Sequence, residues 1–190
     1  MPNKPIDPSV IKAFRAKSDF DAMFTTATAR FWGLAFDPTA LKAQGWVESA
    51  LFPKAVSPCG ASGIMQFMPE TWKEAKAAIQ VVDIFNPEEN IMAGAWYMRR
   101  LWDEWEQFKQ HDEIYKFALA SYNGGVGNIH KALTLCMRDP FLAIPQPNRC
   151  NWATVSGYLD NITGHENSIQ TIDYVNKITS ILVLARQAGI

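Results

Sequence analysis

Apolar residues recur at the spacing of an α-helix in the two longest predicted segments, residues 87–108 and 167–187. The first segment repeats them at Ile91, Ala95, Met98, Leu101, Trp102 and Trp105, and the second at Ile169, Ile172, Val175, Ile178, Ile181 and Leu182. Residues three or four apart share one face of a helix, so each set predicts a stripe that packs into the core. No segment shows the alternation of a half-buried strand, and we therefore predict a mostly helical fold.

Helix ends are marked by short capping sequences. A capping side chain stands before a proline at Asp7-Pro8, Asp37-Pro38 and Asn86-Pro87, and each pair predicts a helix start. Glu89 follows Asn86 by three residues, the spacing of a capping box in which the two residues bond each other. Ser18 and Asp21 have the same spacing, and Gly33 is placed to end the helix that follows them.

Further helices are predicted over residues 69–78, 112–122 and 126–137. The prolines and glycines of residues 53–68 exclude one regular element there. Asn123-Gly124-Gly125 predicts a sharp break, because glycine adopts backbone angles that other residues avoid.

The helix predicted over residues 38–49 is apolar on most sides, and Lys42 and Glu48 are its only charged residues. A helix of this kind is usually buried, so a carboxyl near its end would lose contact with water. Loss of water favours the neutral carboxylic acid, which is the form that a general acid needs. Glu48 is therefore a candidate proton donor.

The length of 190 residues suits one domain and needs no disulfide to support its core, so we expect a single domain over residues 1–190. A net charge of −1 argues against nucleic acid as a partner. The beginning of the chain lacks the apolar stretch of an export signal, and no apolar run reaches about 18 residues, so stable membrane insertion is not expected.

Cysteines and histidines offer little further chemistry. Cys136 and Cys150 flank a Pro-rich segment and have the sequence positions to close it as a disulfide, but without an export signal we expect buried thiols. The three histidines lack the spacing of metal ligands, so we expect no metal and no other cofactor.

A long motif follows the candidate acid. Glu48-Ser49 precedes Ser57-Pro58-Cys59-Gly60-Ala61-Ser62-Gly63 and Met65-Gln66-Phe67-Met68-Pro69, and a later segment reads Ser121-Tyr122-Asn123-Gly124-Gly125. These runs resemble the soluble-type lytic transglycosylases, whose pattern is an acid–serine pair, then Ser-Pro-x-Gly-Ala-x-Gly, Met-Gln-x-Met-Pro and Ala-Tyr-Asn-Ala-Gly. The stretch from Asp83 to Ile91 is also similar. The resemblance covers residues 20–135 well, whereas residues 136–190, a Pro-rich loop and a C-terminal helix, match weakly.

The resemblance implies an α+β lysozyme-like fold, shared with goose-type lysozyme, that carries a catalytic glutamate at the end of a buried helix. It makes Glu48 the sole catalytic acid and base. It implies that these residues line the sugar cleft: Ser57, Gln66, Met68, Tyr122 and Asn123. Tyr174 would approach the same site from the last helix, and Ser57 would hydrogen-bond Glu48.

Simpler roles stay open for several of these residues. Ser57 also suits a turn beside proline, and Met68 and Tyr174 also suit the core. Tyr122-Asn123 also suits a helix end, where asparagine tolerates left-handed geometry.

Gln170 and Gly124 are departures from the family pattern. Gln170 stands four residues before Tyr174, where the family often has glutamate, so the charge that a peptide stem of the substrate would meet is different. Gly124 replaces the usual alanine.

The implied reaction is non-hydrolytic cleavage of peptidoglycan between N-acetylmuramic acid and N-acetylglucosamine, which leaves a 1,6-anhydro ring. Hydrolysis usually needs a second carboxylate, and no acidic residue follows Glu48 before Glu70. A hydrolytic muramidase on the same fold, and a wall-binding or virion module without catalysis, are the alternatives.

Peptidoglycan lies outside the inner membrane, yet no export signal is visible. We therefore expect a bacteriophage protein, carried in the particle or released through a membrane hole at lysis, with other virion or lysis proteins as partners. A bacterial protein whose signal was removed, or a specialised-secretion muramidase, is the other interpretation.

Overall fold

The computed structural model describes residues 7–107, 111–140 and 150–189, and regular structure in these ranges is helical. Two isolated bridges, Val56 with Ser62 and Ser62 with Phe67, are the only extended pairings within those ranges. The prediction of a mostly helical fold is confirmed. The chain divides into two compact units, Met1–Arg99 with Lys177–Ile190 and Arg100–Asn176, so the expected single domain stays a prediction.

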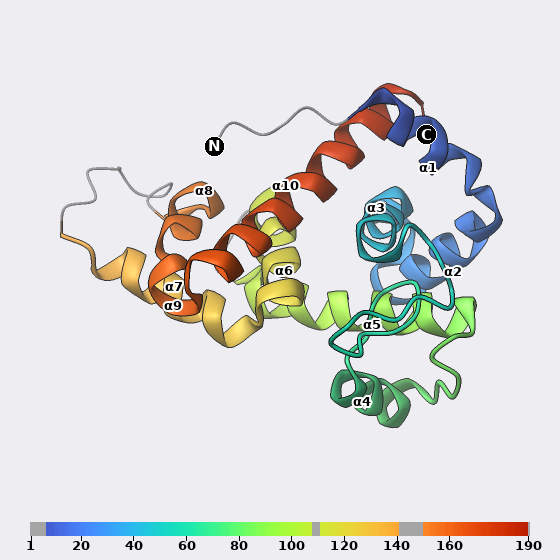
Figure 1. Ribbon diagram of the computed structural model, residues 1–190, viewed down its shortest axis with the longest axis horizontal. Coiled ribbons are helices and arrows are strands. Elements are labelled where there is room, and N and C mark those ends of the chain that lie inside the picture. Colours follow the sequence, from blue (N-terminus) through green and yellow to red (C-terminus); the bar gives the residue numbers. More distant parts are fainter. Residues whose placement is uncertain (1–6, 108–110, 141–149, 190) are drawn as a thin grey trace. The chain divides into compact units, whose positions relative to one another are not determined.

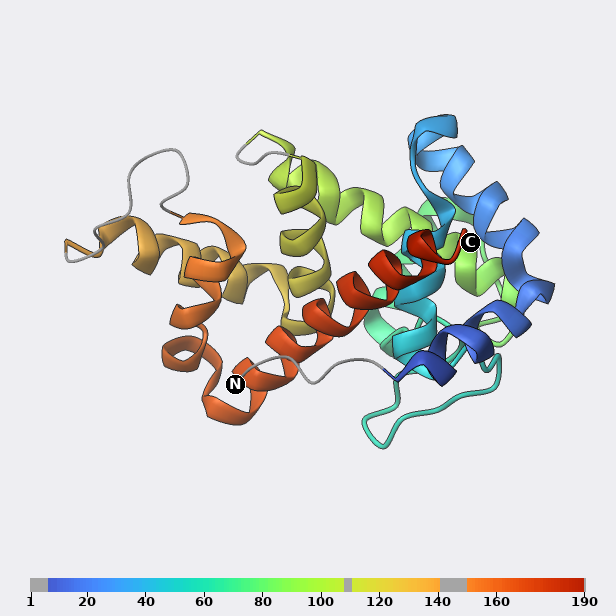
Figure 2. The same ribbon diagram turned by 90° about the horizontal axis from the view of Figure 1, so that it is seen from above.

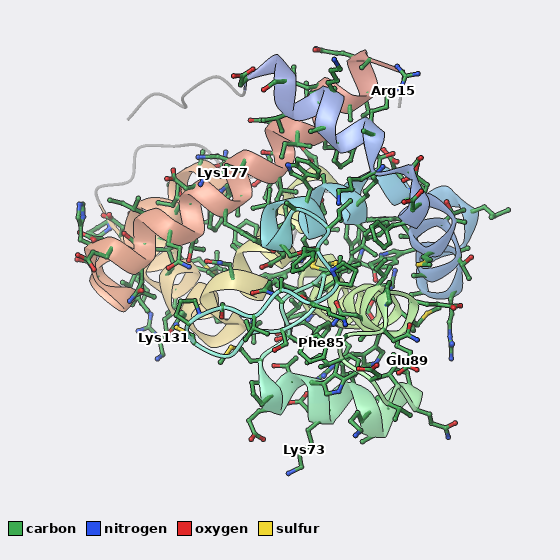
Figure 3. The ribbon with its side chains drawn as sticks, turned by 45° about the vertical axis from the view of Figure 1, so that its right-hand side comes forward. Arg15, Lys73, Phe85, Glu89, Lys131 and Lys177 are labelled. Atoms are coloured by element: carbon green, nitrogen blue, oxygen red, sulfur yellow. The ribbon has the colours of Figure 1, made fainter. Side chains whose placement is uncertain are left out.

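The first unit packs its helices around a long irregular segment. Its elements are α1 (Pro8–Ala16), η1 (Ser18–Phe20), α2 (Asp21–Trp32), η2 (Gly33–Ala35), α3 (Pro38–Ser49), α4 (Pro69–Ile79), the beginning of α5 (Pro87–Glu106) and the end of α10 (His165–Gln187). Helices α2 and α3 pack against each other, and residues 50–68 loop past α3 before α4 begins (Figure 1). Trp72 and Ala75 of α4 are buried, whereas Lys73 extends outward from that helix (Figure 3).

The second unit contains the remaining helices. Its elements are the end of α5, α6 (His111–Gly124), α7 (Val126–Arg138), α8 (Trp152–Val155), η4 (Ser156–Tyr158), α9 (Asp160–Thr163) and the beginning of α10. Helices α6 and α7 pack together (Figure 2), and Gly125 joins them with a φ of 83°, which confirms the predicted break. The ring of Phe117 contacts those of Trp105 and Trp152 and forms an aromatic core.

Three predicted helix ends are confirmed. The Asp7 carboxylate accepts a hydrogen bond from the Ser9 N–H at 2.8 Å, and Asp37 accepts one from the Thr39 N–H at 2.9 Å. Gly33 ends α2 with a φ of 71°. These caps depend only on neighbouring residues, which is why the sequence pattern finds them.

The capping pair predicted at Ser18 and Asp21 is wrong. Residues 18–20 form the short helix η1, and no side chain caps the start of α2. The Asp21 carboxylate instead lies 2.5 Å from the ammonium of Lys42 on α3. A buried ammonium is a stronger partner for a carboxylate than a backbone N–H at a solvent-exposed helix end.

The capping box predicted at α5 is half correct. The Asn86 Oδ1 accepts from the Glu89 N–H at 3.2 Å, as an N-cap does. The Glu89 carboxylate does not reach back to Asn86. It accepts from the N–H of Asp83 at 2.8 Å and from that of Val82, and so fixes the segment that leads into α5.

Both predicted core stripes are present, with one correction. Every stripe residue of α5 is buried, and so are Val175, Ile178, Ile181 and Leu182 of α10, whereas Ile172 is half-buried. Ile169 is 41% exposed, so its predicted inward position is wrong. Ser168 and Thr171 take the buried positions of that turn, because their hydroxyls find acceptors there, the His165 carbonyl at 2.8 Å and the Asn123 Oδ1 at 3.0 Å.

The cysteines are thiols, buried at Cys136 and Cys150 and exposed at Cys59, which matches the expectation. Residues 141–149 of the Pro-rich segment and the predicted helix end at Phe108 lie outside the described residues. Among the described residues, no helix has the length and apolarity to cross a membrane, and no group of three acidic, histidine or cysteine side chains is placed to hold a metal ion.

Candidate active site

Glu48 lies one residue before the end of α3. The run from Ala40 to Gly45 is buried at every position, and the helix then emerges so that Glu48 is half-buried. A carboxyl in this position has left part of its water shell but still borders the surface. The structure thus places Glu48 at the end of a buried helix, and its role as a proton donor stays a prediction.

The backbone reverses sharply just after the candidate acid. Ala50 and Leu51 both have positive φ angles, 53° and 58°, which side chains with a Cβ rarely adopt. The Ala50 N–H donates to the Trp46 carbonyl at 2.8 Å, and the Leu51 side chain is fully buried. Burial of Leu51 and the helix-end bond offset the strain, and the chain turns back past α3.

Ser49 ties the end of α3 to the motif loop. Its Oγ donates to the Ile64 carbonyl at 2.8 Å and accepts from the Phe52 N–H at 3.2 Å. The first bond spans 15 residues and holds the loop beside Glu48. This role of Ser49 is not predictable from the sequence, because a serine after a glutamate carries no signal of its own.

Asn90 holds the same loop from α5. It is 1% exposed, its Oδ1 accepts from the Met65 N–H at 2.7 Å, and its Nδ2 donates to the Ile84 carbonyl at 2.8 Å. A Cβ at Gly63 would lie 2.2 Å from the Asn90 amide nitrogen, and Gly63 has a φ of 81°. Glycine at 63 and asparagine at 90 therefore depend on each other, a relation that the sequence does not reveal.

Ser57 forms a turn. Its Oγ accepts from the Ala61 N–H at 3.0 Å, and its own N–H donates to the Ala61 carbonyl at 2.8 Å. This geometry is the turn role that stayed open for Ser57. The predicted hydrogen bond to Glu48 stays a prediction.

Hydrogen bonding within the loop also fixes the conformation of Gln66. It has a φ of 49°, and its Nε2 donates to the Gly63 carbonyl at 2.9 Å. This bond engages the donor side of the amide and orients its Oε1 as an acceptor. The neighbouring Phe67 is buried against Trp72 and Tyr97, and this aromatic contact anchors the loop.

Met68 stands at the start of α4 and is 44% exposed. An exposed methionine in the motif offers apolar surface to a ligand, whereas a core role would require burial. The core interpretation of Met68 is therefore not supported.

The other predicted site residues belong to the second unit. Tyr122 and Asn123 are half-buried near the end of α6, and the Asn123 Oδ1 accepts from the Thr171 hydroxyl at 3.0 Å. Tyr174 is only 6% exposed, which agrees with a core position. The structure thus gathers Glu48, Ser57, Gln66 and Met68 in one unit and the remaining three residues in the other.

Comparison with family models matches residues 28–139 to the Transglycosylase SLT domain. The match spans more than half of the chain, and the chain belongs to this family.

Two curated relatives have related names. Membrane-bound lytic murein transglycosylase F of Vibrio parahaemolyticus is 37% identical over 101 residues, which cover 53% of this chain and 18% of the relative. The protein of the same name from Pseudomonas putida is 30% identical over 123 residues, which cover 65% of this chain and 23% of the relative. The chain therefore spans about a fifth of the length of these relatives.

Two solved structures share the fold. The 70 kDa soluble lytic transglycosylase SLT70 from Escherichia coli has a TM-score of 0.68 at 23% identity, over 92% of this chain and 25% of that one. An inactive variant of lytic transglycosylase Slt from Pseudomonas aeruginosa has a TM-score of 0.66 at 22% identity, with the same coverage. These similarities confirm the fold class.

Proposed function

We propose that the chain is a peptidoglycan lytic transglycosylase with Glu48 as its single catalytic acid and base. The observation that carries the proposal is the half-buried position of Glu48 at the end of a buried helix, beside a motif loop that Ser49 and Asn90 hold in place. Membership of the transglycosylase family supports the same activity.

The proposed reaction needs one carboxyl. Glu48 protonates the glycosidic oxygen between N-acetylmuramic acid and N-acetylglucosamine, and the C1–O bond breaks. The Glu48 carboxylate then takes the proton of the C6 hydroxyl of the N-acetylmuramic acid. The C6 oxygen bonds to C1 of the same sugar, which closes the 1,6-anhydro ring. The substrate's own N-acetyl group stabilises the cationic sugar. Glu70, the next acidic residue, is exposed on α4.

Binding residues are proposed for each unit by itself. Ser57, Gln66 and Met68 contact the sugar near Glu48, through a hydroxyl, an amide oxygen and an apolar face. In the second unit, Tyr122 and Asn123 bind the glycan strand. Tyr174, which is buried in α10, is proposed to approach the strand from that helix.

The test of the proposed acid is Glu48→Gln, which keeps the size of the side chain and removes the proton. Wall lysis is expected to fall by about 100-fold or more, the usual contribution of a general acid. Glu88→Gln, at an exposed position of α5, is the matched control and is expected to leave lysis unchanged. Equal lysis by wild type and Glu48→Gln would exclude Glu48 as the catalytic acid, and an absence of lysis by the wild type would leave the wall-binding module as the better interpretation.

Mass spectrometry of digested cell wall separates the two enzymatic alternatives. Anhydro products support the transglycosylase, whereas reducing ends that carry one added water support a muramidase. Glu70→Gln adds a second arm, because a hydrolase that used Glu70 as its other carboxylate would lose activity with that change.

We propose a phage origin for the chain as well, with delivery by the particle or release at lysis. Genes for virion or lysis proteins beside its own gene would support this origin. A position among bacterial cell-wall genes would contradict it.

A further inference from the structure

Two of the three cysteines lie in the second unit, beside elements that pack against each other. Cys136 belongs to the last turn of α7 and is fully buried, and Cys150 directly precedes the N-cap of α8 and is 9% exposed. Helix α7 packs against both α8 and the short helix η4 (Figure 1). The third cysteine, Cys59, is exposed on the motif loop of the first unit, so the buried thiols can be studied as a pair of their own.

Hydrogen bonds fix the backbone next to both thiols. The Asp139 N–H donates to the Cys136 carbonyl at 3.4 Å at the end of α7. The Glu113 carboxylate accepts from the Trp152 N–H at 2.5 Å, and this bond attaches the start of α8, two residues after Cys150, to α6. A disulfide between two ordered positions constrains the unfolded chain and takes little further freedom from the folded one.

Tyr158 of η4 lies near both cysteines. Its hydroxyl donates to the Asp139 carboxylate at 2.5 Å, three residues after Cys136. This hydrogen bond is the main cause that raises the pKa of Tyr158 to about 12, and negative charge on the Cys136 and Cys150 sulfurs raises this pKa further. Effects of charge fall off over about 10 Å in salt solution, so both sulfurs lie in the neighbourhood of the same phenol oxygen.

The compartment decides whether such a pair of thiols stays reduced. Cytosolic thiols are kept reduced, whereas disulfides form and persist in the periplasm and outside the cell. A chain that cleaves peptidoglycan works outside the inner membrane and therefore meets an oxidising environment. This step of the inference rests on the proposed function.

We propose that Cys136 and Cys150 form an intramolecular disulfide outside the reducing cytosol, and that the two buried thiols are its reduced form. The oxidant is another disulfide, either a small molecule or the active-site disulfide of a thiol oxidoreductase. Cys150, the more exposed of the two, loses its proton and attacks one sulfur of the oxidant, which releases one thiolate. Cys136, as a thiolate, then attacks the Cys150 sulfur and releases the second thiolate. Two electrons pass to the oxidant, and its two sulfurs take up the two cysteine protons.

The experiment oxidises the full chain in its folded state. Wild type is purified under dithiothreitol, freed of it and incubated with oxidised glutathione; remaining thiols are then alkylated, and the tryptic peptides are weighed without reduction. Trypsin cuts after Arg138 and Arg149, between the two cysteines, so the disulfide joins peptides 132–138 and 150–177. The joined species is expected to be about 2 Da lighter than the sum of the two peptides, because two hydrogens are lost. Dithiothreitol is expected to separate the peptides again.

A melting curve measures the effect of the bond on stability, with Cys59→Ser as the parent. Closing a loop of about 15 residues constrains the unfolded chain, and the oxidised parent is expected to melt about 5–10 °C above its reduced form. Cys136→Ser and Cys150→Ser, each made in this parent, are the matched controls, because each leaves one sulfur of the pair. Neither control is expected to show joined peptides or a rise in Tm with oxidised glutathione. The peptide map of the wild type does not depend on how well these variants fold.

Cys59 shows whether the oxidant has acted, since its exposed thiol is expected to form a mixed disulfide with glutathione. Modification of Cys59 while Cys136 and Cys150 are both recovered as alkylated thiols overturns the proposal. So does joining of the two peptides only after unfolding in urea, or a lower Tm of the oxidised parent. Wall lysis by the wild-type chain is measured separately. Normal lysis with two persistent thiols refutes only the disulfide, and absent lysis with joined peptides refutes only the proposed function.

Discussion

Ser49 is the residue whose removal most directly tests how the motif loop is held beside Glu48. Ser49→Ala deletes the half-buried donor to the Ile64 carbonyl and is expected to lower the free energy of unfolding by about 1 kcal/mol. Wall lysis is expected to fall as well, because the loop loses its attachment to α3. Urea denaturation measures the first effect, and Ser156→Ala, which loses an exposed bond to Ala153 in its own turn, is the control. Equal losses in both variants would contradict the role of Ser49.

At the scale of residues, the sequence locates the candidate acid but not its supports. Glu48 is found because a long contiguous motif follows it. Ser49 and Asn90 are missed because their bonds reach 15 and 25 residues along the chain. Thr171 is missed for the same reason, since its partner Asn123 lies 48 residues away.

At the scale of elements, an ion pair joins α2 and α3, and its two side chains differ in their exposure to solvent. Lys42 is 4% exposed and its ammonium lies 4.6 Å from the centre of the Phe14 ring, whereas the Asp21 side chain is 49% exposed. Asp21→Ala leaves the ammonium buried without its carboxylate, and we expect the free energy of unfolding to fall by about 1–2 kcal/mol, because solvent screens a half-exposed partner. Thermal or urea unfolding measures it.

Lys42→Met completes the comparison for α2 and α3. Methionine keeps an apolar stem against Phe14 and buries no charge, so this change is expected to cost less than Asp21→Ala. A larger loss of unfolding free energy in Lys42→Met than in Asp21→Ala would contradict the interpretation that the cost of burying the ammonium exceeds the other energies of the pair.

Helix boundaries are well predicted where the signal is local. Asp7, Asp37 and Gly33 act on their own turns, and the structure confirms them. Glu89 and Asp21 have side chains that reach other segments, so the partner cannot be read from spacing. Ile169 is exposed for a related reason, because two polar neighbours in its turn have acceptors inside the unit.

At the scale of the whole molecule, one tyrosine links unfolding to alkaline pH. Tyr158 donates to the Asp139 carboxylate at 2.5 Å, and this hydrogen bond raises the pKa of Tyr158 to about 12. The unfolded chain releases this proton near pH 10, the ordinary value for tyrosine. The stabilisation is therefore fully present below pH 10 and is lost as the pH rises towards 12.

Tyr158→Phe isolates this effect from every other group that titrates in the same range. Below pH 10 the variant is expected to have a lower Tm than the wild type, because it lacks the bond to Asp139. Between pH 10 and 12 the wild-type Tm falls more steeply, so the two curves converge. Absorbance of the phenolate gives an independent measure, since the late-titrating tyrosine of the folded wild type is missing from the variant. Parallel Tm curves across this range would show that Tyr158 does not keep its proton in the folded state.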